Sequence, residues 1–235
     1  MAIEPGDHRF PAVDGVLVAF SGGKDSLAVL DLCCERYARV VAWHMAFLPG
    51  LDFTQALIDY CRERWDVELR VYQHFIISYF LQNGVFCEPV TVPTMAITDV
   101  EDAVRADTGL EWIAYGYRRQ ESLQRRGMLS AWGPGAVGHQ RKCFAPIADW
   151  SPRGTMRYLQ QRAIAFPPPT RGWDLTPQHL AWVKQAWPAD YQRILEVFPY
   201  ADYQVHRADA ANAELRAIRV HGRRKSPGAI EAPTV

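Results

Sequence analysis

The sequence predicts an α/β fold: a doubly wound, mostly parallel, Rossmann-like sheet followed by a C-terminal helical extension. Two observations lead to this expectation. In the first half of the chain, apolar β-rich runs alternate with segments of helical periodicity, which is typical of parallel strands joined by crossover helices. Beyond residue 150 only helical patterns follow, interrupted by the proline-rich stretch 166–173. We therefore expect one domain over residues 1–165 and a helical extension with a disordered tail over residues 166–235.

The individual elements follow from these patterns in chain order. The predicted strands are 15–20, 39–47, 66–74 and 110–117. The predicted helices are 25–38, 54–65, 77–82, 98–109, 155–164, 176–187 and 189–198. Thr54 is the expected N-cap of the second helix, and Gly109 is expected to end the fourth. Large aromatic side chains of the extension are expected in a helix core: Trp173, Trp182, Trp187, Phe198 and Tyr200.

The composition is that of an ordinary globular protein. Of the 235 residues, 49% are hydrophobic and 22% are charged, and the formal net charge is zero. This neutrality disfavours nucleic acid as the main partner, although the segment from Arg207 onward is basic. No apolar run is long enough for a membrane helix and no secretion signal is visible, so we expect a cytoplasmic protein without a membrane partner.

The five cysteines form no C-x-x-C pair, so the sequence holds no local signature of a zinc or iron–sulfur site. They are expected to be reduced thiols in or near the core. Cys33, Cys34 and Cys61 lie on predicted helices, whereas Cys87 and Cys143 lie in less regular segments. Cys143 follows Arg141 and Lys142, which favours a lowered thiol pKa.

A polar, glycine-rich loop separates the first strand from the first helix. It consists of Ser21, Gly22, Gly23, Lys24, Asp25 and Ser26. The two glycines permit a tight turn and close approach of another group to the backbone. The following helix points its unsatisfied N–H groups at the same space, and the serine hydroxyls and Lys24 add donors. The loop therefore predicts a phosphate cradle, in which Asp25 either caps the helix or helps to hold Mg²⁺.

Arginines gather after the fourth predicted strand, in the stretch GYRRQESLQR that begins at Gly116. Guanidinium groups bind phosphate or sulfate oxygens in a bidentate fork, so Arg118, Arg119 and Arg125 or Arg126 are candidate anion ligands. Glu121 is placed to pair with one of them.

Two further expectations concern single residues elsewhere. His44 lies either near an adenine ring or in the core, and Asp149 is expected to cap a helix at Thr155, with Trp150 as a buried anchor.

Three motifs together resemble a known superfamily. The loop matches the PP-loop, S-G-G-x-D-S, of the ATP pyrophosphatases and adenine nucleotide α-hydrolases, whereas the spacings of the Walker loop and the dinucleotide fingerprint are absent. The arginine stretch resembles G-x-R-R-x-E-S-x-x-R, and the stretch from Ala145 resembles P-(L/I)-x-D-W-(S/T), both of the phosphoadenylylsulfate (PAPS) reductase-like branch. That branch includes the small subunit of ATP sulfurylase. The resemblance covers about residues 16–165.

The resemblance implies a nucleotide-binding domain with ATP as substrate and Mg²⁺ as cofactor. It implies catalytic roles for Lys24, Arg118 and Arg119. It implies nucleotide contacts for the loop residues 21–26, His44 and Gly116, and it implies supporting roles for Glu121, Ser122 and Arg125.

Three functions remain open from the sequence. In the first, ATP is cleaved between its α- and β-phosphates, pyrophosphate leaves, and an unidentified acceptor such as sulfate is adenylylated. In the second, PAPS is reduced to sulfite, but the reductases use a thiol in a C-terminal E-C-G-L-H segment and no cysteine follows Cys143 here. In the third, the chain is a non-catalytic nucleotide-binding module, with a partner protein or a second copy bound through residues 166–235.

Overall fold

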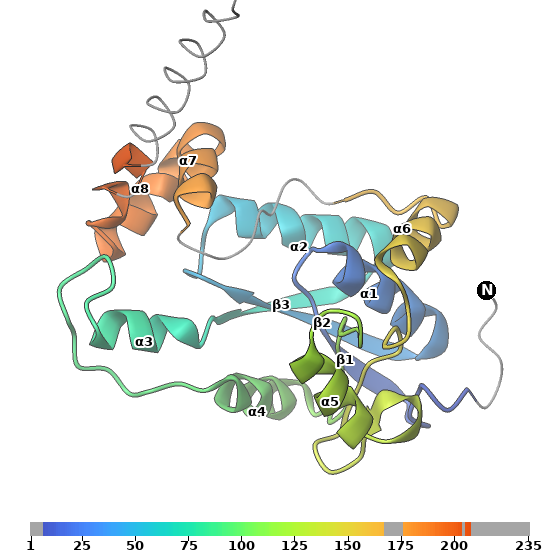
Figure 1. Ribbon diagram of the computed structural model, residues 1–235. Coiled ribbons are helices and arrows are strands. Elements are labelled where there is room, and N and C mark those ends of the chain that lie inside the picture. Colours follow the sequence, from blue (N-terminus) through green and yellow to red (C-terminus); the bar gives the residue numbers. More distant parts are fainter. Residues whose placement is uncertain (1–6, 167–175, 204, 208–235) are drawn as a thin grey trace, which may run out of the picture. The chain divides into compact units, whose positions relative to one another are not determined.

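The computed structural model describes residues 7–166, 176–203 and 205–207 (Figure 1). The chain divides into two compact units, residues 1–174 and 175–235. The strands are β1 Gly15–Ala19, β2 Arg39–Ala46, β3 Glu68–Gln73, β4 Ile113–Ala114, β5 Val137–Gly138 and β6 Cys143–Phe144. The helices of the first unit are α1 Lys24–Arg36, α2 Asp52–Trp65, α3 Ile76–Gln82, α4 Ile97–Thr108, α5 Leu123–Ala131 and α6 Pro152–Gln161, with a 3₁₀ turn at Pro134–Ala136.

The sheet of the first unit has the strand order β3-β2-β1-β4-β6-β5. All neighbouring pairs are parallel except β5 and β6, which are antiparallel at one edge. β1 lies between β2 and β4, and its register pairs Val18 with Ala42 and with Ala114. The expected doubly wound, mostly parallel α/β sheet is therefore confirmed.

Helices cover both faces of the sheet. On one face, α1, α2 and α6 bury Leu27, Leu57 and Leu159 in a continuous apolar core. On the other face, Val100 and Val104 of α4 pack against Leu17 and Trp43. This layering follows from strands whose side chains are apolar on both faces, because such strands must be covered twice. It leaves the carboxyl edge of the strands as the place where loops meet.

Several predicted boundaries are wrong. α2 begins at Asp52, so Thr54 lies inside the helix as a buried residue and does not cap it. The fourth strand is only Ile113–Ala114, because the chain beyond it leaves the ladder and turns toward α1. Cys143 lies in β6, not in an irregular segment. Gly109 does end α4 in a left-handed conformation with φ 70°.

The second unit contains α7 (Pro177–Ala186) and α8 (Pro188–Val197). Leu180, Val183, Tyr191, Ile194 and Phe198 are buried. Tyr200 is 50% exposed, so the expectation that it is a core residue is wrong. Trp173 and the tail beyond Arg207 lie outside the described residues. Within the described part of the chain, no helix combines the length and apolar character that a membrane span requires.

Candidate functional site

A cavity of about 310 Å³ lies where the parallel strands end. This is the edge at which doubly wound sheets bind ligands, and the volume lies within the range of small-molecule sites. Its wall includes residues of β1 and β2 and residues that directly follow β3 and β4. The lining side chains include Phe20, Ser21, Asp25, Ser26, Trp43, His44, Met45, His74, Tyr115, Tyr117, Glu121 and Arg125.

The glycine loop opens directly into α1. Gly22 has φ 75°, a left-handed conformation that a residue with a Cβ adopts only at a cost. Gly23 is the N-cap residue, and no side chain caps the helix. The first turn of α1 therefore presents backbone N–H groups without a side-chain acceptor, together with the positive end of the helix dipole. This arrangement suits an anion.

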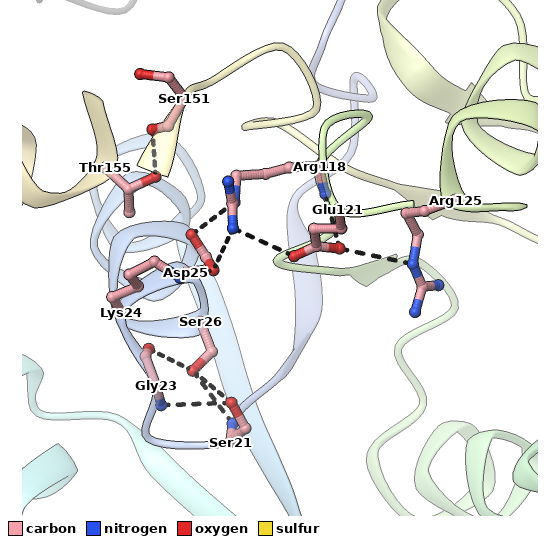
Figure 2. Close-up of polar contacts among 10 residues, drawn as sticks. All are labelled: Ser21, Gly23, Lys24, Asp25, Ser26, Arg118, Glu121, Arg125, Ser151 and Thr155. Atoms are coloured by element: carbon pink, nitrogen blue, oxygen red, sulfur yellow. Dashed lines mark hydrogen bonds and ion pairs between the residues drawn. The ribbon is translucent and has the colours of Figure 1, made fainter. Parts of the chain in front are cut away.

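The two serines brace the loop from within (Figure 2). Ser26 is buried, and its hydroxyl donates to the carbonyl of Gly23 at 2.9 Å and accepts from the backbone N–H of Ser21 at 3.2 Å. The Oγ atoms of Ser21 and Ser26 are 3.1 Å apart, and the Gly23 N–H donates to Ser21 Oγ at 3.3 Å. The serines therefore fix the loop before any ligand binds, which reduces the entropy lost on binding.

Asp25 is clamped between two cations. Lys24 Nζ lies 2.6 Å from Asp25 Oδ2. Arg118, which is 5% exposed, places Nε 2.9 Å from Oδ1 and donates from Nη2 to Oδ2 at 3.2 Å. Glu121 Oε1 lies 3.5 Å from Arg118 Nη2 on the other side of the guanidinium, as Figure 2 shows. Arg118 thus ties the end of β4 to the start of α1.

Gly116 makes this tie possible. A Cβ atom at this position would lie 3.0 Å from the backbone carbon of Asp25 and 3.1 Å from the Ser26 nitrogen. Only a glycine allows the chain after β4 to pass so close to the first turn of α1 without displacing it. Gly116 therefore has a role in backbone packing, and it also lies on the cavity wall, as its expected contact with the nucleotide requires.

Arg125 is the arginine that lines the cavity. Its guanidinium carbon lies 3.5 Å from the centre of the Tyr117 ring, and its Nε lies 3.7 Å from Glu121 Oε2. Burial raises the pKa of Tyr117, and the charge of Arg125 opposes part of that rise. Ser122, expected as a supporting residue, caps α5 by accepting the Arg125 N–H at 3.0 Å. The cap and the ring together set the position of this guanidinium.

Arg119 points to a different set of partners. Its Nε lies 2.9 Å from Asp149 Oδ1, and its Nη1 donates to Ser130 Oγ at 3.0 Å. The prediction that Asp149 caps the following helix is wrong, because Ser151 does so and accepts the Gly154 N–H at 3.0 Å. Of the three residues expected to be catalytic, Lys24, Arg118 and Arg119, none belongs to the cavity wall.

Two histidines line the cavity from the ends of β2 and β3. His44 Nδ1 lies 2.9 Å from the Phe20 carbonyl, which fixes Nδ1 as the donor and Nε2 as an acceptor. Burial lowers the pKa of His44. Burial, with the nearby His44 as a second cause, lowers the pKa of His74 to about 4. Both rings are therefore neutral at pH 7 and suit a nucleobase better than an anion.

We expect these histidines to make stability depend on pH. In the unfolded chain His74 titrates near ~6.5. Between about pH 6.5 and about 4 the unfolded chain binds a proton that the folded chain does not, so the free energy of unfolding falls as the pH is lowered through this window. Thermal unfolding of the natural protein and of His74→Gln at pH 7 and pH 5 measures the effect. Between pH 7 and pH 5 the unfolding temperature of the variant should fall less than that of the natural protein. An equal fall in both proteins would contradict the lowered pKa of His74.

The contacts of Asp25 do not fit direct coordination of Mg²⁺. Both of its carboxylate oxygens already contact cations, from Lys24 and Arg118. Nor do the described residues contain a group of three His, Cys, Asp or Glu side chains placed to hold a metal ion. Mg²⁺ thus remains an expectation from the sequence, and no step below depends on it.

Burial raises the pKa of all five cysteine thiols, which disfavours the nucleophilic thiolate form. Burial raises the pKa of Cys34 and of Cys61 to about 12, and of Cys143 to about 11. Arg105 and Arg141 oppose the rise at Cys143, but burial and the charge of Glu101 outweigh them. The expectation that neighbouring basic residues lower the Cys143 pKa is wrong, because β6 is buried inside the sheet.

Sequence reasoning missed several wall residues, chiefly Trp43, Met45, His74 and Tyr117. Trp43 lies inside β2 and carries no signal of this kind. Met45, His74 and Tyr117 lie near the end of a predicted parallel strand, where a doubly wound sheet binds its ligand. Taking the residues at every strand end, rather than only those in motifs, would have included them.

Solved structures with a similar arrangement include three enzymes. A PAPS reductase from Candida auris has 13% identity and a TM-score of 0.43, over 67% of this chain and 76% of that one. A tRNA thiolase from Methanococcus maripaludis has 14% and 0.41, over 82% and 72%. An NH₃-dependent NAD synthetase from Campylobacter jejuni has 14% and 0.40, over 94% and 91%. At these values the likeness carries no argument about reaction or substrate.

No curated protein matches the sequence. A family model does match. Residues 15–168, which contain the loop, the arginine stretch and the segment leading into α6, match the model of the phosphoadenosine phosphosulfate reductase domain. The chain therefore belongs to the phosphoadenosine phosphosulfate reductase domain family, within the PP-loop adenine nucleotide α-hydrolase superfamily.

Proposed function

We propose that this protein is an enzyme that binds ATP and cleaves it between the α- and β-phosphates. The observation that carries the proposal is the braced loop at residues 21–26, which opens an uncapped α1 beside the cavity. An oxygen of the acceptor attacks the α-phosphorus, the bond to the bridging oxygen of the β-phosphate breaks, and pyrophosphate leaves. The adenylyl group stays on the acceptor, for which sulfate is the first candidate.

Some of these residues contact the nucleotide, and others hold the contacting residues in position. His44 and Tyr117 offer a neutral, partly aromatic wall for adenine. The N–H groups of the first turn of α1 and the Lys24 ammonium neutralise phosphate charge, which is the main contribution that a protein makes to phosphoryl and adenylyl transfer. Arg125 is the cation on the cavity wall and the candidate ligand for the acceptor or the α-phosphate. Arg118 is a positioning residue, since its guanidinium is buried against Asp25.

Reduction of PAPS to sulfite is the reaction that the family name suggests. It needs a protein thiolate, whereas four of the five cysteines are buried and the fifth, Cys34, is partly buried. None of them belongs to the cavity wall. The thiol chemistry therefore favours nucleotide cleavage over reduction.

We expect Lys24→Ala to weaken ATP binding at least tenfold. A hydrogen bond to a charged group contributes roughly 1.5–3 kcal/mol, and tenfold in affinity is about 1.4 kcal/mol. Calorimetric titration of ATP into both proteins measures the loss. Lys142→Ala is the matched control, because Lys142 is partly exposed, pairs with Glu111 and lies outside the cavity wall. Unchanged affinity in Lys24→Ala would contradict the cradle.

The bond that is cleaved can be identified from the phosphate product. With sulfate as the trial acceptor and ATP labelled at the γ-phosphate, turnover should place the label in pyrophosphate. Label found only in orthophosphate, with ADP as the other product, would show cleavage at the wrong bond.

A further inference from the structure

A second hollow lies beside Lys24, which does not belong to the wall of the first cavity. Its volume is about 340 Å³. Lys24 contributes to its wall together with residues of α6, namely Pro152, Arg153, Met156, Arg157 and Gln160. The wall thus carries three cationic side chains and no carboxylate. A concave surface of this kind attracts an anion.

α6 is held firmly enough to form such a wall. Tyr158 donates its hydroxyl to Asp31 Oδ2 at 2.7 Å, and Arg162 Nε donates to the same oxygen at 2.9 Å. Asp31 lies on α1 and is buried, so these bonds fasten α6 against α1. Ser151 caps the other end of α6, and its backbone carbonyl accepts the hydroxyl of Thr155, as Figure 2 shows.

The positive charges of Arg153 and Arg157 are electrostatically unfavourable for α6 itself. They are one turn apart on the same face, where like charges repel, and Arg153 lies in the first turn of α6, where the helix dipole disfavours cations. Within the described residues, neither guanidinium has a hydrogen bond or an ion pair. The first turn of α6 contains no acidic residue. A bound anion would satisfy both arginines and relieve this repulsion.

Lys24 connects this hollow to the proposed ATP site. It belongs to the glycine loop, yet its side chain lines the hollow and not the cavity. Its neighbour Asp25 lines the cavity. A triphosphate with its adenosine in the cavity and its α-phosphate at the first turn of α1 would therefore direct its outer phosphates past Lys24 toward α6.

We propose that Arg153 and Arg157, together with Lys24, form a subsite for the β- and γ-phosphates of the nucleotide and for the pyrophosphate that leaves. The proposal rests on the proposed function, since it assumes that ATP occupies the cavity. It assigns to α6 a role in discriminating nucleoside triphosphates from monophosphates, because only the former reach the two arginines.

The test is a calorimetric titration of the full chain with ATP, with AMP and with inorganic pyrophosphate. The variant is the double substitution Arg153→Gln and Arg157→Gln, and the matched control is Arg36→Gln, at the opposite end of α1. We expect the double variant to lose at least tenfold in affinity for ATP and for pyrophosphate, while its affinity for AMP changes less than twofold. The control should change none of the three.

Each other outcome counts against the subsite. If the natural protein binds AMP and ATP and the double variant binds ATP equally well, the subsite is wrong and the proposed function stands. Natural protein that binds no ATP would overturn both. Equal losses for AMP and ATP, with an unchanged unfolding temperature, would also overturn the subsite, because AMP does not reach the two arginines. A double variant that keeps ATP but loses a single-stranded RNA oligonucleotide would assign the hollow to nucleic acid.

Discussion

Asp25→Ala is expected to lower the free energy of unfolding by about 3 kcal/mol. The substitution leaves the Arg118 guanidinium buried without its main counter-ion, and stranding one partner of a buried ion pair costs roughly 3–5 kcal/mol. We expect the lower end of that range because Glu121 remains 3.5 Å from the same guanidinium. Urea unfolding of the natural protein and of the variant measures the loss.

A double-mutant cycle separates the ion pair from simple loss of packing. Arg118→Met removes the charge but keeps an unbranched chain in the buried space, and Asp25 still has Lys24 as a partner. We expect Asp25→Ala to cost far less in the Arg118→Met background than in the natural one, since no charge is then stranded. Equal costs in both backgrounds would show that Asp25 and Arg118 do not act as a pair.

Gly116→Ala is expected to destabilise the protein by about 1–3 kcal/mol and to weaken ATP binding together with stability. The new Cβ would lie 3.0 Å from the backbone carbon of Asp25, so the start of α1 must move, and overpacking of this kind typically costs about that much. Thermal unfolding and calorimetry on the same samples measure both effects.

Gly127→Ala is the matched control for this substitution. Gly127 lies in the middle of α5, and a Cβ there would meet nothing within 4 Å. Alanine in a helix is more favourable than glycine by roughly 0.5–1 kcal/mol, so this variant should be slightly more stable. If both variants behaved alike, the close approach of Gly116 to α1 would have no consequence for the site.

The sequence predicted the parts of the site that lie in one short segment. The loop at residues 21–26 could be placed because the strand before it and the helix after it have strong periodicity, and because its six residues are contiguous. The parallel sheet could be predicted for the same reason. The two-residue strands β5 and β6 could not, because a segment that short has no periodicity of its own and is defined by its neighbours.

The roles of the arginines could not be separated from sequence. Arg118 and Arg119 are adjacent, yet one is buried against Asp25 and the other reaches Asp149. Which carboxylate neutralises which arginine depends on partners 93 and 30 residues away, and no local pattern encodes those distances. The same limitation applies to Asp149, which was expected to cap α6. The helix begins at Pro152, so Ser151 is the residue in the N-cap position.

A crystal structure of the protein with α,β-methylene-ATP tests the central claim most directly, because this analogue keeps its triphosphate uncleaved. We predict adenine between His44 and Tyr117, the α-phosphate at the N–H groups that follow Gly23, and the outer phosphates on the Lys24 side of the loop. An analogue bound away from residues 21–26, or one whose phosphates point away from the start of α1, would contradict it.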